Sequence, residues 1–178
     1  MEEKQLTAEE KNSSQQKTSK PWKNGRTPSA IAEDLKKQKS LLKKTEETLQ
    51  TMGELIAACH FKEAIRAAMT LAQEANRYLE EKSPWKVIKT DKQAAAVTLY
   101  VALTVISGLR TAFYPFLPFS SQKLHEYLGY EGKVEDDGWQ LRLPSPGQQL
   151  QPPQPLFAKL DEEVIEQETA RLGKNSNI

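Results

Sequence analysis

A tryptophan in the triplet Pro84-Trp85-Lys86 lies among basic residues in the middle of this chain. The cations within eight positions of it are Arg77, Lys82, Lys86, Lys89 and Lys92. An aromatic face among cations can stack on an unpaired nucleic-acid base while the cations contact the flanking phosphates. The alternative is that Trp85 is a buried anchor of the protein core, which is the commoner role of a tryptophan.

Side chains that could catalyse a reaction or bind a metal are isolated in the sequence. His60 and His125 each lack the second histidine or the cysteine pair that a metal site needs, so both are predicted to be interfacial or surface residues. The acidic pairs Asp136-Asp137 and Glu162-Glu163 fall in the polar C-terminal stretch, where we expect nothing to shift their pKa values. No glycine-rich phosphate loop is present. The sequence therefore predicts no catalytic residue and no metal site, and it indicates a binding protein.

The elements that would position Trp85 are helices. Residues 1–26 are polar, rich in lysine and without period, which predicts a disordered basic arm. Thr27-Pro28 has the residue types of an N-cap and a first helical position. The helix that follows has a narrow apolar stripe at helical spacing. Its members are Ile31, Leu35, Leu42, Leu49, Met52, Ile56 and Cys59.

A second helix is predicted to run antiparallel to the first and to end near Lys82 or Ser83, because Pro84 cannot continue it. Its predicted stripe consists of Phe61, Ile65, Ala68, Met69, Ala72, Ala75, Asn76 and Leu79. Asp91 is the predicted cap of a third helix that runs to about Phe116. Its uncharged run, Gln93–Leu109, suits a buried central helix better than a membrane span.

A short fourth helix is predicted to begin with Ser120 or Ser121 as its cap and to stop at Gly129. We therefore expect an all-α antiparallel bundle over residues 27–130. Residues 131–178 are rich in Pro, Gly and Gln, and they predict an extended tail with a short C-terminal helix that packs back on the bundle. One domain accounts for the 178 residues.

Charge is distributed unevenly, although the whole chain carries only +1. Residues 1–40 have a net charge of +3 and residues 131–178 one of −4, so a nucleic acid would prefer the first part of the chain. Cys59 is the one cysteine, which excludes an internal disulfide. Residues 1–30 contain no apolar core of a signal peptide.

The order and spacing of several segments over roughly residues 28–172 resemble the C-terminal anticodon-binding domain of bacterial-type methionyl-tRNA synthetases. These segments are Phe61-Lys62-Glu63-Ala64, Ala75-Asn76-Arg77-Tyr78-Leu79, Pro84-Trp85-Lys86, Pro115-Phe116-Leu117-Pro118-Phe119-Ser120, His125-Glu126-Tyr127-Leu128-Gly129 and Pro155-Leu156-Phe157-Ala158-Lys159-Leu160-Asp161. The resemblance implies an all-α bundle of the class I synthetase anticodon-binding type. It also implies that Trp85 stacks on an anticodon base.

The resemblance implies that tRNA, and methionine tRNA in particular, is the partner, in the cytoplasm. The candidate anticodon-binding residues are Trp85, Pro84, Lys86, Lys89 and Arg77, with Asn76 and Tyr78 as structural support. The parent enzyme attaches methionine to its tRNA with ATP and Mg²⁺. This chain contains neither the HIGH-type nor the KMSKS-type catalytic signature, so we expect no cofactor in it and a separate catalytic subunit as a further partner.

Two features leave room for a second interpretation. The family also reads the anticodon with an Asn and an Arg four residues apart, and no predicted helix here contains that pair. The narrow stripe from Leu35 to Ile56 has the spacing of a helix that binds another helix. The alternative function is therefore a non-catalytic helical protein-interaction module with Trp85 in its core.

Overall fold

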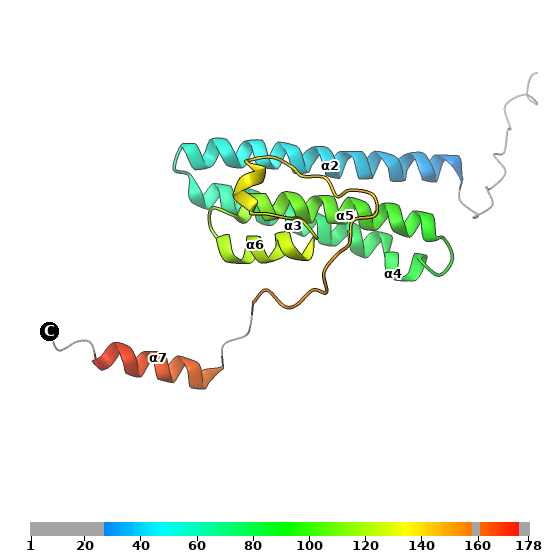
Figure 1. The fold of residues 1–178 in the computed structure, drawn as a ribbon. Coiled ribbons are helices and arrows are strands. Elements are labelled where there is room, and N and C mark those ends of the chain that lie inside the picture. The colour runs from blue at the N-terminus through cyan, green and yellow to red at the C-terminus, as the bar shows by residue number, and fades with distance from the viewer. Residues whose placement is uncertain (1–26, 158–160, 175–178) are drawn as a thin grey trace, which may run out of the picture.

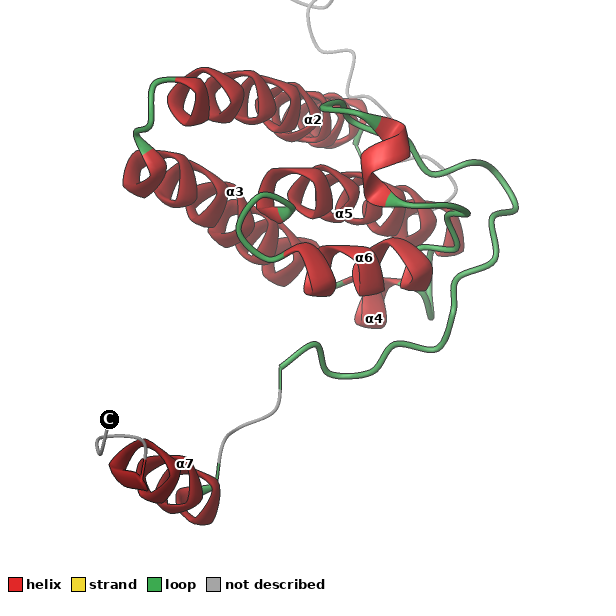
Figure 2. Ribbon diagram, turned by 60° about the vertical axis from the view of Figure 1, so that its left-hand side comes forward, coloured by secondary structure: helices red, strands yellow, loops and turns green. Residues whose placement is uncertain are grey.

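The computed structural model describes residues 27–157 and 161–174, and all its regular elements are helices. Figure 1 shows three long helices side by side, α2 (Pro28–Ala57), α3 (Phe61–Lys82) and α5 (Lys92–Phe113), with neighbours in the chain running antiparallel. The shorter elements are α4 (Pro84–Val87), α6 (Pro118–Tyr127), the 3-10 turn η1 (Val134–Asp137) and α7 (Glu162–Lys174). Figure 2 shows α6 against α5. The predicted all-α antiparallel bundle is confirmed. The predicted basic arm, with Trp22, lies outside the described residues.

The first helix begins where the sequence predicted. The hydroxyl oxygen of Thr27 accepts a hydrogen bond from the Ala30 amide at 3.3 Å, and Pro28 occupies the first helical position. The helix ends in a tight reversal at Cys59, whose φ of 60° is left-handed. The amide of His60 donates to the Leu55 carbonyl at 2.8 Å and that of Cys59 donates to Ile56 at 3.0 Å. This pair of bonds defines a Schellman cap and turns the chain directly into α3.

The buried face of α2 differs from the predicted stripe. Leu49 and Met52 are buried as predicted, but Leu35 is 49% exposed. The buried face is completed by Leu41, Thr45 and Thr48. Thr45 can be buried because its hydroxyl donates to the Leu41 carbonyl of the same helix at 2.9 Å, which leaves its methyl group to pack. Counting threonine as polar therefore rotated the predicted stripe away from the true face.

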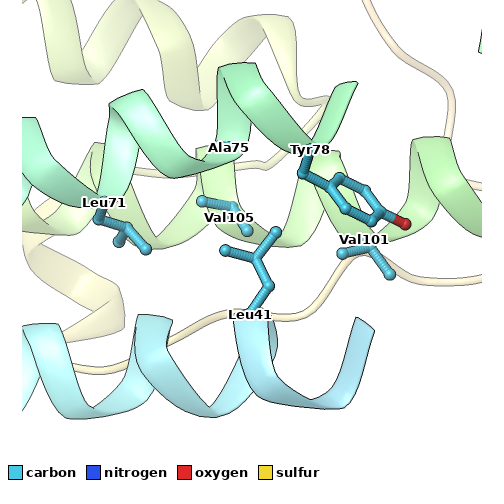
Figure 3. Packing of buried hydrophobic residues seen from close by; sticks show 6 residues of the cluster. All are labelled: Leu41, Leu71, Ala75, Tyr78, Val101 and Val105. Atoms are coloured by element: carbon cyan, nitrogen blue, oxygen red, sulfur yellow. The ribbon is translucent and has the colours of Figure 1, made fainter. Parts of the chain in front are cut away.

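The buried face of α3 is also rotated from the prediction. Its members are Ala64, Ala68, Leu71, Ala75 and Tyr78, of which only Ala68 and Ala75 were predicted. The bulkier residues Phe61, Ile65 and Met69 are exposed on the flank of the helix. Small alanines permit the close approach of α2 and α5, so larger side chains are displaced to the side. Figure 3 shows the resulting core, in which the side chains of Leu41, Leu71, Tyr78, Val101 and Val105 meet with Ala75.

Helix α5 is the centre of the bundle, as predicted. The carboxylate of Asp91 accepts from the Ala94 amide at 3.0 Å, which confirms it as the cap. Of the described helices, only α5 is long and apolar enough to span a membrane by length and composition, and most of it is buried against its neighbours. It ends at Phe113, a little before the predicted Phe116. The predicted caps of α6 are wrong, because the helix already starts at Pro118 and Ser121 is buried inside it.

Residues 130–144, which we call the strap, cross the bundle over α2 and α5. Val134 and Pro144 are buried. The indole nitrogen of Trp139 donates to the Leu49 carbonyl at 2.8 Å. The hydroxyl of Ser107 donates to the Arg142 carbonyl at 2.6 Å. The first part of the predicted extended tail therefore belongs to the packed structure. At its far end, every side chain described in α7 is exposed, and its packing on the bundle stays a prediction.

His125 is fully buried, which corrects the prediction of an isolated interfacial or surface histidine. Its Nδ1 accepts from the Arg110 guanidinium at 2.6 Å, and its Nε2 donates to the Glu131 carbonyl at 3.1 Å. This pattern requires the neutral ring with its hydrogen on Nε2. Burial lowers the pKa of His125 from the usual 6.5, and the charge of Arg110 acts in the same direction, although the bond to Glu131 opposes both.

The second prediction to be corrected here concerns Asp137. Its carboxylate accepts from Arg110 at 2.6 Å and from Arg142 at 2.7 Å. Burial tends to raise the pKa of Asp137, but the hydrogen bond and charge of Arg110, together with the charge of Arg142, outweigh burial and lower it. The acidic pair Asp136-Asp137 is therefore part of a buried ion network that holds the strap on α5.

Candidate nucleic-acid interface

The segment that carries Trp85 is a rigid corner between α3 and α4. Helix α3 ends at Lys82, as predicted, and Ser83 adopts a left-handed conformation with φ 41° and ψ 57°. The Ser83 amide donates to the Leu79 carbonyl at 2.8 Å and its hydroxyl donates to Glu80 at 2.7 Å. Pro84 then starts α4 at a position that needs no amide donor. The chain is thus held on both sides of the corner.

Trp85 projects from this corner and is 56% exposed, whereas Pro84 beside it is buried. On a one-turn helix two neighbours point about 100° apart, so burying Pro84 against the bundle directs Trp85 outward. Helix α4 packs against α5, which fixes the base of the ring. The expectation of a partly packed ring with an open side agrees with this exposure, and the interpretation of Trp85 as a core anchor is wrong.

The lysines near Trp85 divide into two groups. Lys86 and Lys89 are exposed, one on α4 and one in the turn after it, so both are free to approach a ligand beside the ring. Lys82 is not, because its side chain is 14% exposed and forms an ion pair with Asp34 of α2. Lys82 therefore closes the α2–α3 interface instead of joining the cations around Trp85.

Three predicted residues lie before the corner, on α3. Tyr78 is 6% exposed and belongs to the core, where burial raises its pKa while nearby Thr98 and Gln38 lower it. Asn76 is exposed on the outer side of α3. Arg77 lines a groove of about 690 Å³ between α2 and α3, together with Lys36 and Glu81. Trp85 is not among the residues of that groove, so the structure brings Lys86 and Lys89 to the Trp85 surface but places Arg77 on another one.

Metal binding was considered over residues 27–157 and 161–174. These ranges contain no group of three or more His, Cys, Asp or Glu side chains that could hold a metal ion. The buried Arg110–His125–Asp137 network is the one set of ionisable residues that the sequence did not predict. A signal for it exists, since Arg110 directly follows the uncharged run of α5 and a buried arginine requires an acidic partner.

A helical bundle that presents an exposed tryptophan and lysines on one rigid corner has the features of a helical nucleic-acid-binding domain. The model of the family described as the anticodon binding domain of methionyl tRNA ligase matches residues 28–177. The chain belongs to this family.

Curated relatives agree with this assignment. The chain is 56% identical over 134 residues to the methionine--tRNA ligase of Dehalococcoides mccartyi strain 195, which covers 75% of this chain and 24% of the relative. It is 43% identical over 163 residues to the methionine--tRNA ligase of Chloroflexus aurantiacus, covering 77% of this chain and 27% of that one. The chain therefore spans about a quarter of the length of the curated relatives it matches.

The fold also matches a solved structure. The apo form of Mycobacterium tuberculosis methionyl-tRNA synthetase is similar with a TM-score of 0.62 and 24% sequence identity, over 70% of this chain and 26% of that chain. This similarity confirms the predicted fold class, a helical bundle of the synthetase anticodon-binding type.

Proposed function

We propose that this chain binds the anticodon of a tRNA, with methionine tRNA as its substrate class. The observation that carries the proposal is the exposed ring of Trp85 on a rigid corner, in a domain whose family is defined by anticodon binding. An unpaired anticodon base offers the flat face that such a ring can stack on.

The division of labour that we propose follows from the positions of the side chains. Pro84 and the left-handed Ser83 hold the ring in place before the tRNA arrives, which reduces the entropy lost on binding. Lys86 and Lys89 contact the phosphates on either side of the stacked base. Tyr78 supports the corner from the core and Asn76 supports it from α3. Arg77 contributes from the α2–α3 groove, through the more distant backbone of the tRNA.

We further propose that the chain acts as the anticodon-binding part of a methionyl-tRNA ligase. The parent reaction, in which ATP and Mg²⁺ serve the attachment of methionine to tRNA, would then require a separate catalytic subunit. This division is supported by the quarter of the relatives' length that the chain spans and by the absence of catalytic signatures from its 178 residues. A cytoplasmic location follows from the same relationship.

A titration of methionine tRNA at two salt concentrations tests the proposal. Phosphate contacts release counterions, so affinity should fall steeply as salt rises. The rival function, a helical protein-interaction module, predicts little salt dependence and no binding of tRNA. Saturable binding that weakens with salt supports anticodon binding. No saturable binding at the lower salt concentration contradicts it.

A further inference from the structure

We infer that α7 folds back as a helical cover onto an apolar groove formed by α3, α5 and α6. This groove has a volume of about 350 Å³. Its walls are Met69, Ile106, Leu109, Phe113, Leu117 and Leu124. Leu156 and Phe157, the last residues described before α7, lie at its edge.

The groove is incompletely filled, although its walls are almost entirely hydrocarbon. Phe157 is 64% exposed and Met69 is 48% exposed. Leu117 and the neighbouring Phe119 are also exposed. A contiguous exposed apolar surface of this kind marks a place where another element packs.

Helix α7 has the properties of the missing element. It has 13 residues, a length at which an isolated helix in water is marginal, since about 12–15 residues are needed even with good helix formers. Val164 and Ile165 are exposed, at 41% and 54%. The stability of such a helix must come from packing its apolar residues on another surface.

The chain path delivers α7 to this groove. The Gln151 amide donates to the Tyr127 carbonyl at 3.0 Å, and the Gln148 side chain is hydrogen-bonded to Leu128, so the tail is fastened to the end of α6. From Phe157 to Glu162 is five positions, which limits the separation to about 17 Å. A tether this short gives an effective concentration in the millimolar range, so modest contacts suffice for docking.

The charges favour the same partner. Helix α7 begins with Glu162 and Glu163, and Glu166 follows. At the groove, exposed Arg66 lies one turn before Met69 on α3, and exposed Lys123 adjoins Leu124 on α6. Opposite charges would therefore flank the apolar contact and orient the helix.

The single cysteine of the chain provides the test. Cys59 is exposed, and Phe61, two residues later, packs edge-on against Phe116 at 6.4 Å beside the groove. A nitroxide on Cys59 should remove most of the amide signal intensity of residues 162–172 in a nuclear magnetic resonance spectrum of the whole chain. Ile165→Asp should restore these signals. The control Ala170→Asp places the same charge about 140° around the helix and should leave the broadening intact.

Two outcomes would overturn the inference. One is unbroadened α7 signals in the labelled chain, or equal broadening in Ile165→Asp. The other is broadening that passes from a labelled chain to an isotope-enriched Cys59→Ser chain in a mixture, because the groove would then hold a second copy. Broadening confined to the labelled molecule and lost in Ile165→Asp supports the fold-back.

Discussion

The guanidinium of Arg110 donates to the carboxylate of Asp137 across 2.6 Å, although 27 positions separate the two residues in the chain. Arg110 is fully buried in the central helix and Asp137 ends the 3-10 turn of the strap. The bond therefore connects the core of the bundle with the segment that crosses its surface. Arg142 of the strap donates to the other carboxylate oxygen at 2.7 Å and stacks on the Tyr130 ring at 4.2 Å from its centre.

Asp137→Ala should lower the free energy of unfolding by about 3–5 kcal/mol, because it leaves the buried charge of Arg110 without its partner. Urea denaturation followed by circular dichroism measures this loss. Glu131→Ala is the control, since its exposed carboxylate lies in the same stretch and should change stability by less than about 0.5 kcal/mol. Equal small effects of the two substitutions would show that the ion pair does not hold the strap.

The stability of the fold should decrease as the pH falls, in two stages. The pKa of His125 is lowered in the folded state, so below 6.5 the unfolded chain takes up a proton that the folded chain does not, and stability falls from there. The pKa of Asp137 is also lowered, so its contribution is complete above 3.8 and is lost as the pH falls further, through the folded-state pKa.

Melting temperatures measured in steps between pH 8 and pH 3 test this order. His125→Asn keeps an acceptor near the position of Nδ1 but cannot be protonated. It should remove the first stage and leave the second one. An unchanged first stage in this variant would assign the titration to another group.

Helices α2 and α5 meet at Gly108, where a β-carbon would lie 2.4 Å from the Thr45 methyl group. Gly108→Ala should therefore destabilise the fold by about 1–3 kcal/mol through overpacking, despite the better helix propensity of alanine. Thermal or urea unfolding measures the change. Thr45→Ser removes the methyl group and should recover part of the loss in the double variant. Stabilisation by Gly108→Ala alone would contradict the close approach.

Lys86→Gln and Lys89→Gln should each weaken tRNA binding evenly across anticodon variants. Each should also reduce the slope of log affinity against log salt by about 0.7, the value for one contact to a single strand. Fluorescence anisotropy at several salt concentrations gives both quantities. Lys43→Gln is a matched control, because Lys43 is paired with Glu47 at 3.2 Å on the exposed side of α2. A loss of the same size in the control would indicate nonspecific attraction only.

The order and the ends of the helices could be predicted from local chemistry. Thr27-Pro28, Pro84 and Asp91 act on their own backbone neighbours, and the structure places each where expected. The buried faces of α2 and α3 could not be predicted as well, because the choice depends on what the facing helix offers. Thr45 is buried opposite Gly108, whereas Phe61 is left exposed.

The candidate site could be predicted in part for the same reason. The exposure of Trp85 follows from the proline before it, which is a local effect. The ion pair of Lys82 with Asp34 joins positions 48 apart and leaves no local signal. The network of Arg110, His125 and Asp137 likewise forms only after three separate segments have packed together.

The central claim is that Trp85 reads a base of the anticodon. The most direct measurement compares the affinities of Trp85→Ala and of the unmodified chain for methionine tRNA and for tRNAs altered at single anticodon positions. We expect a loss of about 1–3 kcal/mol and the disappearance of discrimination at one position, with little change in stability because the ring is 56% exposed.

Trp139→Ala is the matched control for this measurement. Gly53, against which Trp139 packs, is 19 positions along α2 from Asp34, the partner of Lys82 at the Trp85 end. This spacing places the two tryptophans about 28 Å apart along the bundle. Trp139→Ala should lower stability and leave discrimination among anticodons intact. An equal loss of affinity for all tRNAs in Trp85→Ala, or a large fall in its melting temperature with unchanged binding by the folded fraction, would contradict the assignment.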